Sequence, residues 1–255
     1  MAAKLHPARV EQASGGVALA MSGRWRGEGG QHQGARPYQE DSWALKRLAD
    51  GALLAVVADG MGGHAGGAVA SKLAVDAFVK SIEGGGLLSE ALQAANTAVR
   101  AGAAGKPELS GMGATLVAVL LLGEQVRWIS VGDSPFFLVS PAGIEQLNAD
   151  HSLAPQIDAL AARGLITAEE AANHPGRHTL REAVMGEPLN LIDEGVRQLG
   201  VDARLLVCSD GVQSLDDSQI AAHAAKPVKG LIEAVLAARS VHQDNVTVIK
   251  LEREP

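Results

Sequence analysis

The chain has 255 residues, of which 47% are hydrophobic and 20% are charged, a composition typical of a globular protein that buries a sizeable core. Its formal net charge of −7, without a run of five like charges, argues against a surface built to bind nucleic acid or an anionic membrane. The single cysteine, Cys208, excludes an internal disulfide and fits a reducing compartment. No secretory signal opens the chain, and the longest apolar run, 114–122, is too short to span a bilayer, so we expect a cytoplasmic protein.

Residues 1–14 are polar and predict a poorly ordered lead-in, whereas 15–255 are expected to form a single domain. A short strand is predicted over 17–21, followed by a loop rich in Gly, Gln and Arg that runs to Tyr38. Further on, apolar and β-branched runs bounded by turn residues predict buried strands at 53–58, 115–122, 126–131, 136–139, 205–208 and 246–251. The gap between 115–122 and 126–131 is too short for a crossover helix, so this pair is predicted to form an antiparallel hairpin.

Helical spacing of apolar residues predicts three amphipathic helices, within 69–82, 88–99 and 231–236, which would cover the faces of a sheet. Between His151 and Pro188 the pattern becomes rich in helix and poor in strand. Within that stretch Thr167 and Glu170 have the spacing of a capping box before a short helix. We interpret 151–188 as an insert or flap of the same domain.

Four aspartates fall at the ends of predicted strands. Asp59, Asp133 and Asp210 close the stretches LLAVVAD, VRWISVGD and RLLVCSD, whereas Asp244 opens DNVTVIKL. If the strands involved run antiparallel, the four carboxylates gather at one rim. Crowded carboxylates in a partly dry site repel one another, and a divalent cation relieves that repulsion. The alternative interpretation is that each aspartate caps a turn after its strand, which suits a single residue better than a set of four.

The donors at this rim are all oxygens, without a cysteine pair or a His-x-x-x-His spacing, which favours Mg²⁺ or Mn²⁺ over zinc. The glycine-rich stretch at 59–67 follows a strand and opens a helix, and Gly60, Gly62 and Ala65 match a dinucleotide-binding fingerprint. A nucleotide-binding fold needs parallel strands alternating with helices, which the predicted hairpin contradicts. We therefore favour close approach of the backbone to a metal or phosphate, with the Gly60 carbonyl available to a cation.

Seven short motifs follow one another along the chain: RPYQED at 36–41, VADGMGGHAG at 57–66, GMGATL at 111–116, VGDS at 131–134, DHS at 150–152, CSDG at 208–211 and DNVT at 244–247. In this order they resemble the metal-dependent serine/threonine protein phosphatases of type 2C, in their compact bacterial form. The resemblance covers most of the chain. It implies an α+β fold, namely an antiparallel β-sandwich flanked by helices in four layers, α-β-β-α, with the metals in a cleft at one end.

The resemblance also implies a set of metal ligands. Asp59 would bridge two Mn²⁺ or Mg²⁺ ions, the Gly60 carbonyl would bind one of them, and Asp210 and Asp244 would complete the protein ligands of the second ion. Bacterial members often carry a third, looser ion, for which Asp133 together with Asp210 would be the ligands here.

The remaining site residues follow from the same resemblance. Glu40 and Asp41 would hold metal-bound waters, and Arg36 would pair with the substrate phosphate in a bidentate manner. His64 is the candidate general acid, so that Arg36, Asp41 and His64 form the predicted catalytic set. In animal-type members the histidine directly follows Asp-Gly, where Met61 stands here, so ordering the loop or touching the substrate is the alternative role for His64.

The expected activity is hydrolysis of phosphoserine and phosphothreonine on proteins that a serine/threonine kinase has phosphorylated. A water bridging two ions would attack phosphorus in line, without a covalent intermediate. Cys208 lies inside an apolar strand, and Ser214 stands where a cysteine phosphatase would need its arginine, so we interpret the thiol as structural. His151 is likewise expected to make structural hydrogen bonds. We expect a monomer. The alternatives are a catalytically silent phosphoprotein-binding regulator of the same fold, and a phosphatase devoted to one regulatory partner such as a sigma-factor antagonist.

Two positions depart from the pattern of the family. Pro135 follows the VGDS motif where arginine is frequent, and Gln39 replaces the usual asparagine of the first motif. Arg36, Glu40 and Asp41 are all retained, so the substitution at Gln39 is expected to be tolerated.

Overall fold

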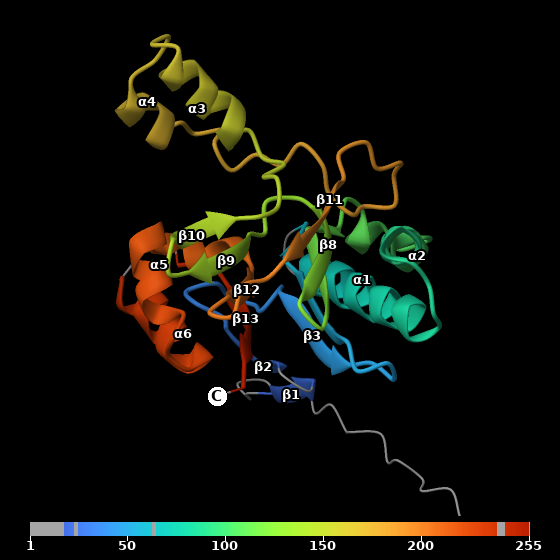
Figure 1. Cartoon of the computed structure of the whole chain (residues 1–255). Coiled ribbons are helices and arrows are strands. Elements are labelled where there is room, and N and C mark those ends of the chain that lie inside the picture. Colours follow the sequence, from blue (N-terminus) through green and yellow to red (C-terminus); the bar gives the residue numbers. More distant parts are fainter. Residues whose placement is uncertain (1–17, 23–24, 63–64, 239–242, 255) are drawn as a thin grey trace, which may run out of the picture.

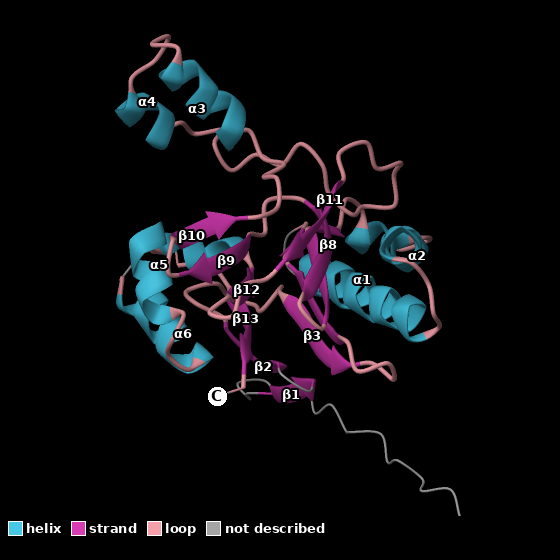
Figure 2. Cartoon of the chain, in the orientation of Figure 1, coloured by secondary structure: helices cyan, strands magenta, loops and turns pink. Residues whose placement is uncertain are grey.

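The structure of the protein is a computed structural model that describes residues 18–22, 25–62, 65–238 and 243–254. Two antiparallel sheets face each other, and helices cover the outer side of each sheet (Figures 1 and 2). This arrangement confirms the predicted α+β sandwich with four layers. The lead-in expected over residues 1–14 lies outside the described residues.

The first sheet has the strand order β1-β2-β13-β12-β9-β10, and every neighbouring pair in it is antiparallel. Its strands are β1 (Ala18–Ser22), β2 (Trp25–His32), β9 (Phe136–Ser140), β10 (Gly143–Gln146), β12 (Arg204–Cys208) and β13 (Val246–Arg253). Two helices, α5 (Asp217–His223) and α6 (Val228–Ala237), lie against its outer face (Figure 1).

The second sheet has the order β11-β8-β7-β4-β3, again with antiparallel neighbours throughout. Its strands are β3 (Ser42–Arg47), β4 (Leu53–Ala58), β7 (Leu116–Leu122), β8 (Gln125–Val131) and β11 (Asp193–Gln198), and its outer face is covered by α1 (Ala65–Glu83) and α2 (Leu88–Ala103). The predicted hairpin is therefore confirmed as β7 and β8. A short ladder of β5 (Gly60–Met61) and β6 (Gly113–Ala114) stands beside this sheet.

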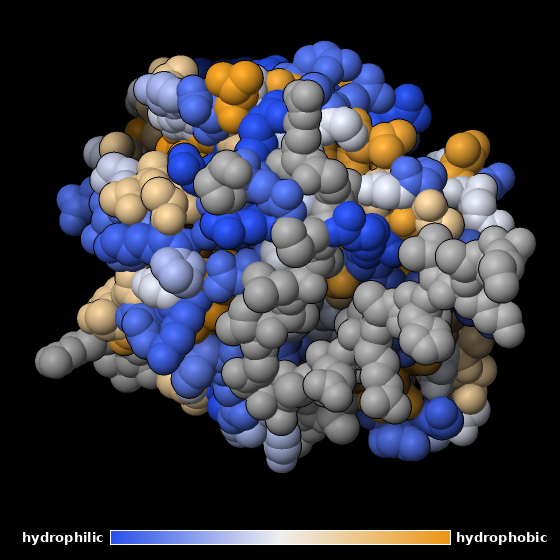
Figure 3. Space-filling view, turned by 60° about the horizontal axis from the view of Figure 1, so that its bottom comes forward, coloured by the Kyte–Doolittle hydropathy of each residue, from blue (hydrophilic) through white to orange (hydrophobic). Residues whose placement is uncertain are grey.

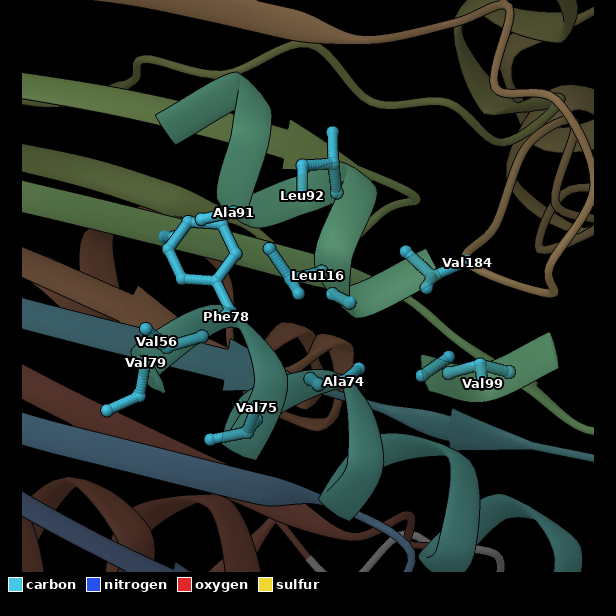
Figure 4. Close-up of a cluster of buried hydrophobic side chains, with 14 of the residues drawn as sticks. Val56, Ala74, Val75, Phe78, Val79, Ala91, Leu92, Val99, Leu116 and Val184 are labelled. Carbon is cyan, nitrogen blue, oxygen red and sulfur yellow. The ribbon is translucent and has the colours of Figure 1, made fainter. Parts of the chain in front are cut away.

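The apolar side chains form three buried clusters that correspond to the interfaces between layers. Figure 4 shows the cluster in which Phe78 of α1 and Leu92 of α2 pack on Leu116 and Val56 of the second sheet. A second cluster lies between the sheets and includes Trp25, and a third lies beneath α5 and α6. Burial of these side chains is the main favourable contribution to folding.

The prediction of a loop up to Tyr38 was wrong over part of its length, because residues 25–32 of this segment form strand β2. Two of the three glycines of β2 face bulky side chains of the other sheet: a Cβ at Gly29 would lie 2.5 Å from the Trp43 ring, and one at Gly27 would lie 2.8 Å from Leu45. Close packing between the sheets therefore makes this glycine-rich segment a strand, although its intrinsic strand preference is low. Strands β3, β10 and β11 and helix α5 were also not predicted.

The segment between β10 and β11 carries α3 (Ala154–Ala162) and α4 (Ala168–Ala172), which project from the sandwich as a flap (Figure 1). The predicted capping box is present, since Glu170 N donates to Thr167 Oγ1 at 3.0 Å and Thr167 N donates to Glu170 Oε2 at 2.7 Å. Arg177 pairs with Asp158 on α3 at 2.6 Å and closes the flap on itself.

The surface of the described part mixes polar and apolar side chains. On the face drawn in Figure 3, hydrophilic residues in blue alternate with scattered hydrophobic residues in orange. Within the described ranges, none of the helices has the length and apolar character needed to cross a lipid bilayer.

Candidate metal centre and active site

The predicted site residues come from loops at strand ends that the topology brings together. Strands β4 and β8 are both antiparallel to β7, so they run in the same direction and end at the same edge, before Asp59 and Asp133. Strands β12 and β13 are antiparallel neighbours, so the end of one and the start of the other place Asp210 and Asp244 together. A hydrogen bond links the two sheets here, because Asp41, just before β3, accepts from Thr247 of β13.

The carboxylates at this end act strongly on one another. Burial raises the pKa of Asp59 well above its ordinary value, and the charges of Asp41 and Asp210 raise that pKa further. Burial and the charge of Asp244 raise the pKa of Asp210 in the same way. Without a compensating cation, this group would retain protons at neutral pH, which is the behaviour expected of a site arranged around positive charge.

Asp41 is buried and has two different oxygen environments. Its Oδ2 accepts from Ser209 Oγ at 2.8 Å and from Thr247 Oγ1 at 2.6 Å. Within the described chain, its Oδ1 and the Oδ1 of Asp210 are buried and have no hydrogen-bond partner. Burial raises the pKa of Asp41 to about 7, against the opposing effect of the two hydroxyls. Buried carboxylate oxygens without a donor are costly and fit a position next to a cation or its bound water.

Asp133 is also a buried carboxylate among like charges. It is only 8% exposed, and burial together with the charges of Asp210 and Asp150 raises its pKa to about 7. The adjacent His151 is also buried, and burial lowers the pKa of its imidazole, so that this ring is neutral at neutral pH. The structure therefore places Asp133 where the charge of Asp210 acts on it.

The loop after Asp59 is held close to the backbone of two other segments. Asp59 N donates to Thr115 Oγ1 at 3.0 Å, Thr115 N donates to the Asp59 carbonyl at 2.9 Å, and Gly60 then pairs with Ala114. A Cβ at Gly60 would overlap the Gly67 carbonyl and lie 2.5 Å from the Glu40 carbonyl oxygen. Only glycine fits this position, and its tight packing against the chain at Glu40 fixes the direction of the loop.

Asn245 is an organising residue of the site that sequence reasoning did not single out. Its Nδ2 donates to the carbonyls of Gln33 at 2.7 Å and Tyr38 at 3.0 Å, and its Oδ1 accepts from Glu40 N at 2.7 Å. One buried amide thus holds the loop of the first motif against the start of β13. The one indication of this role in the sequence is the position of Asn245 directly after Asp244 in the DNVT motif.

Arg36 lies on the loop that Asn245 holds. Its guanidinium forms a hydrogen-bonded ion pair with Asp244 Oδ2, and half of its side chain is exposed. The predicted phosphate-binding residue is therefore adjacent to a predicted metal ligand and open to solvent. Among the predicted site residues, His64 lies outside the described residues.

Cys208 is fully buried within β12, and burial raises the pKa of its thiol. The thiol is therefore protonated at neutral pH and poorly suited to nucleophilic attack. This observation agrees with the structural interpretation made from the sequence.

The donor set fits hard divalent cations. The side-chain donors that converge are carboxylates, and two of their buried oxygens lack a partner within the described ranges. Among the described residues, no three carboxylate, imidazole or thiol groups are placed so that they could hold one ion by themselves. Mg²⁺ and Mn²⁺ bind oxygen donors, and Mg²⁺ usually keeps several waters beside one or two carboxylates.

Comparison with known proteins identifies the family. Residues 27–244 match the family model described as protein phosphatase 2C. Serine/threonine protein phosphatase PstP of Mycobacterium tuberculosis is 36% identical over 212 residues, which are 78% of this chain and 40% of that protein, so the chain spans well under half the length of this relative. Serine/threonine phosphatase stp of Listeria monocytogenes is 32% identical over 234 residues, 86% of this chain and 92% of that protein.

Solved structures agree with these relatives. The crystal structure of the catalytic domain of serine threonine protein phosphatase PstP in complex with two manganese ions superimposes with a TM-score of 0.75 at 31% identity, over 91% of this chain and 99% of that one. The family model and this shared fold lead to the same assignment: the chain belongs to the protein phosphatase 2C family.

Proposed function

We propose that this protein is a metal-dependent serine/threonine protein phosphatase that hydrolyses phosphoserine and phosphothreonine on other proteins. The observation that carries the proposal is the group of buried carboxylates at one end of the sandwich, whose pKa values are raised by burial and by one another. Such a group is stable in its charged form only with cations, and the family to which the chain belongs supplies the reaction. Residues 15–255 act as one catalytic domain, with 151–188 as its flap.

The metal ligands are assigned by the resemblance and supported by the observed grouping. Asp59 and the Gly60 carbonyl would hold one Mn²⁺ or Mg²⁺ ion, and Asp59, Asp210 and Asp244 would hold a second. Asp133 and Asp210 would hold a third ion. When bound, such ions lower the pKa of coordinated water and neutralise charge on the phosphoryl group.

The remaining roles belong to residues around these ligands. Asp41 holds water through Oδ1, because its other oxygen is already occupied by Ser209 and Thr247. Glu40 holds a second such water. Arg36 binds the substrate phosphate, a role supported by its half-exposed guanidinium, which already pairs with the carboxylate of Asp244. His64 protonates the leaving alkoxide.

The substrates we propose are phosphoproteins made by a serine/threonine kinase, so that the protein acts in signalling. We further propose that it works as a cytoplasmic monomer, a location supported by its single, buried cysteine.

Phosphate release from p-nitrophenyl phosphate and from a phosphothreonine peptide tests the proposal. Activity should require Mn²⁺ or Mg²⁺ and disappear in EDTA, and Asp59→Asn and Asp210→Asn should each abolish it. Arg36→Lys serves as the matched control, since it keeps the charge and loses the bidentate geometry, and should raise KM more than it lowers kcat. Retained activity in both aspartate variants would refute the metal assignment. A folded wild-type protein without metal-dependent release at high concentration would favour the catalytically silent alternative.

A further inference from the structure

The flap is joined to the sandwich by two chain segments that pair with each other. Ser152 and Leu180 form an antiparallel bridge, Leu153 N donates to the Thr179 carbonyl at 3.0 Å, and Arg181 N donates to the His151 carbonyl at 2.8 Å. The base of the flap is therefore a small ladder rather than a free hinge. The contacts between this ladder and the sandwich determine which residues of the sandwich the base of the flap can hold in place.

His151 attaches the first segment to the loop that precedes Asp133. His151 N donates to the Gly132 carbonyl at 3.1 Å, and Gly132 N donates to His151 Nδ1 at 3.3 Å. The same two residues thus make a closed pair of hydrogen bonds. Because Nδ1 accepts, the ring carries its proton on Nε2.

The backbone at Gly132 has little conformational freedom. Its φ of +99° lies in the left-handed region, and a Cβ there would lie 2.6 Å from Thr115 Cγ2. Thr115 in turn is hydrogen-bonded to the backbone of Asp59. The imidazole therefore holds the Val131–Gly132 peptide, and the backbone N–H of His151 holds the next peptide, Gly132–Asp133, which leads to the Asp133 side chain.

Asp133 needs such restraint because its neighbours repel it. The charges of Asp210 and Asp150 both act on this buried carboxylate. Like charges near a buried carboxylate disfavour its position, so contacts that fix the backbone next to Asp133 help to keep this side chain in place.

We propose that His151 is a positioning residue: by accepting the Gly132 N–H at Nδ1, it holds Asp133 where the third, loosely bound ion needs it. This inference rests on the proposed function. It makes the base of the flap part of the third metal site, so that the flap and this ion are coupled through one imidazole.

The second flap segment supplies a comparison. Val184 exchanges two backbone hydrogen bonds with Ala114, at 3.1 and 2.8 Å, and its side chain is buried in the core shown in Figure 4. Ala114 in turn pairs with Gly60, so this attachment is connected to the loop at Gly60 and not to Asp133. Disturbing the His151 attachment should accordingly affect one class of ion and spare the others.

The test uses two polar substitutions of similar size. In His151→Asn the side-chain oxygen takes the place of Nδ1 and still accepts from Gly132 N, whereas in His151→Gln the oxygen sits one bond further out. Mn²⁺ binding is counted from the electron paramagnetic resonance signal of free Mn²⁺, which does not depend on turnover. Asp133→Asn marks loss of the third ion, and Arg177→Gln breaks the flap at Asp158 without touching Gly132.

We expect His151→Gln to weaken the loosely bound Mn²⁺ class by about tenfold or more, with the tight class unchanged. In His151→Asn and Arg177→Gln the affinity for the loosely bound Mn²⁺ should stay within about threefold of wild type, a smaller change than the loss of a supporting contact causes. A folded His151→Gln that binds all ions as wild type does would overturn the inference, as would His151→Asn losing the loose class or a wild type that binds only two ions. If His151→Gln does not fold, His151→Ala, which also removes the acceptor for Gly132 N, takes its place, and wild-type binding of all ions by a folded alanine variant would equally overturn the inference. Wild type that binds Mn²⁺ but releases no phosphate would instead contradict the proposed function.

Discussion

At the scale of single residues, the site depends on polar groups that support the carboxylates. Ser209 and Thr247 both donate to one oxygen of Asp41, and Asn245 joins the first motif to the last. Ser209 and Thr247 stand in other motifs than Asp41, so the short motifs support one another across the site. Hydrogen bonds to a buried charged group are worth more than neutral ones and are expensive to lose.

Thr247→Val should therefore destabilise the protein. The substitution keeps the shape of the side chain but removes the hydroxyl that donates to Asp41 at 2.6 Å. We expect the free energy of unfolding to fall by about 1–3 kcal/mol in urea titrations with Mn²⁺ present, and phosphate release to fall with it. Thr247→Ser, which retains the donor, should lie close to wild type. Equal stability of the valine and serine variants would contradict this assignment.

Cys208→Ser should leave turnover largely intact. The thiol is buried, its pKa is raised by burial, and the proposed reaction has no covalent intermediate. Steady-state rates with p-nitrophenyl phosphate and Mn²⁺ provide the measurement, and circular dichroism establishes folding. A folded but inactive variant would mean that the thiol takes part in the reaction.

At the scale of elements, strands and helices are placed by how their faces pack. The continuous apolar runs became central strands, and the amphipathic segments became helices on the outer faces, as expected from their patterns. Strand β2 is different, since its glycines serve to admit Trp43 and Leu45 from the facing sheet.

Gly29→Ala should accordingly destabilise the sandwich. The added methyl group would lie 2.5 Å from the Trp43 ring, so the ring or the strand must move. We expect a loss of about 1–3 kcal/mol, as for other overpacked cores. Gly200→Ala is the control, because a Cβ there meets nothing within 4 Å, and it should change stability by less than about 0.5 kcal/mol. Thermal melts of both variants measure the difference, and equal melting temperatures would contradict the packing role of Gly29.

At the scale of the whole molecule, metal binding and folding are linked through the end of the sandwich. Both sheets contribute carboxylates there, so a cation that binds the folded chain holds the two sheets together. A ligand at about 100 times its Kd stabilises the folded state by about 2.7 kcal/mol. For a protein of this size, Mn²⁺ should then raise the melting temperature over the EDTA-treated protein by roughly 5–10 °C.

The metal-free protein should lose stability as pH rises. Folding raises the pKa of Asp41 and Asp133 from 3.8 to about 7, so the folded state binds more protons than the unfolded state between these values. The contribution is fully present below the ordinary pKa and is lost as pH rises through about 7. Melting temperatures in EDTA should fall between pH 5 and 8, and more weakly so in Asp133→Asn. A rise over this range would contradict the burial of these charges.

Much of the site could be read from the chain without a structure. The four aspartates were singled out because three directly follow an apolar run and Asp244 precedes one, and Arg36, Glu40 and Asp41 because they share one motif. Asn245 was not found, because an amide that bonds three distant backbone groups has no periodic signature. Likewise, the anchoring of the flap by His151 depends on a contact with Gly132, nineteen residues earlier.

By itself, the sequence determined the central strands, the β7–β8 hairpin, the covering helices, the capping box and the family, because these depend on local pattern and on short motifs. Only the tertiary structure decided that a glycine-rich segment is strand β2, that Asp41 has one occupied oxygen and one without a partner among the described residues, and that His151 is hydrogen-bonded to Gly132, the residue before Asp133. Each of these depends on atoms distant in sequence that meet at a few ångströms, and a pattern along one segment contains no information about what will pack against it.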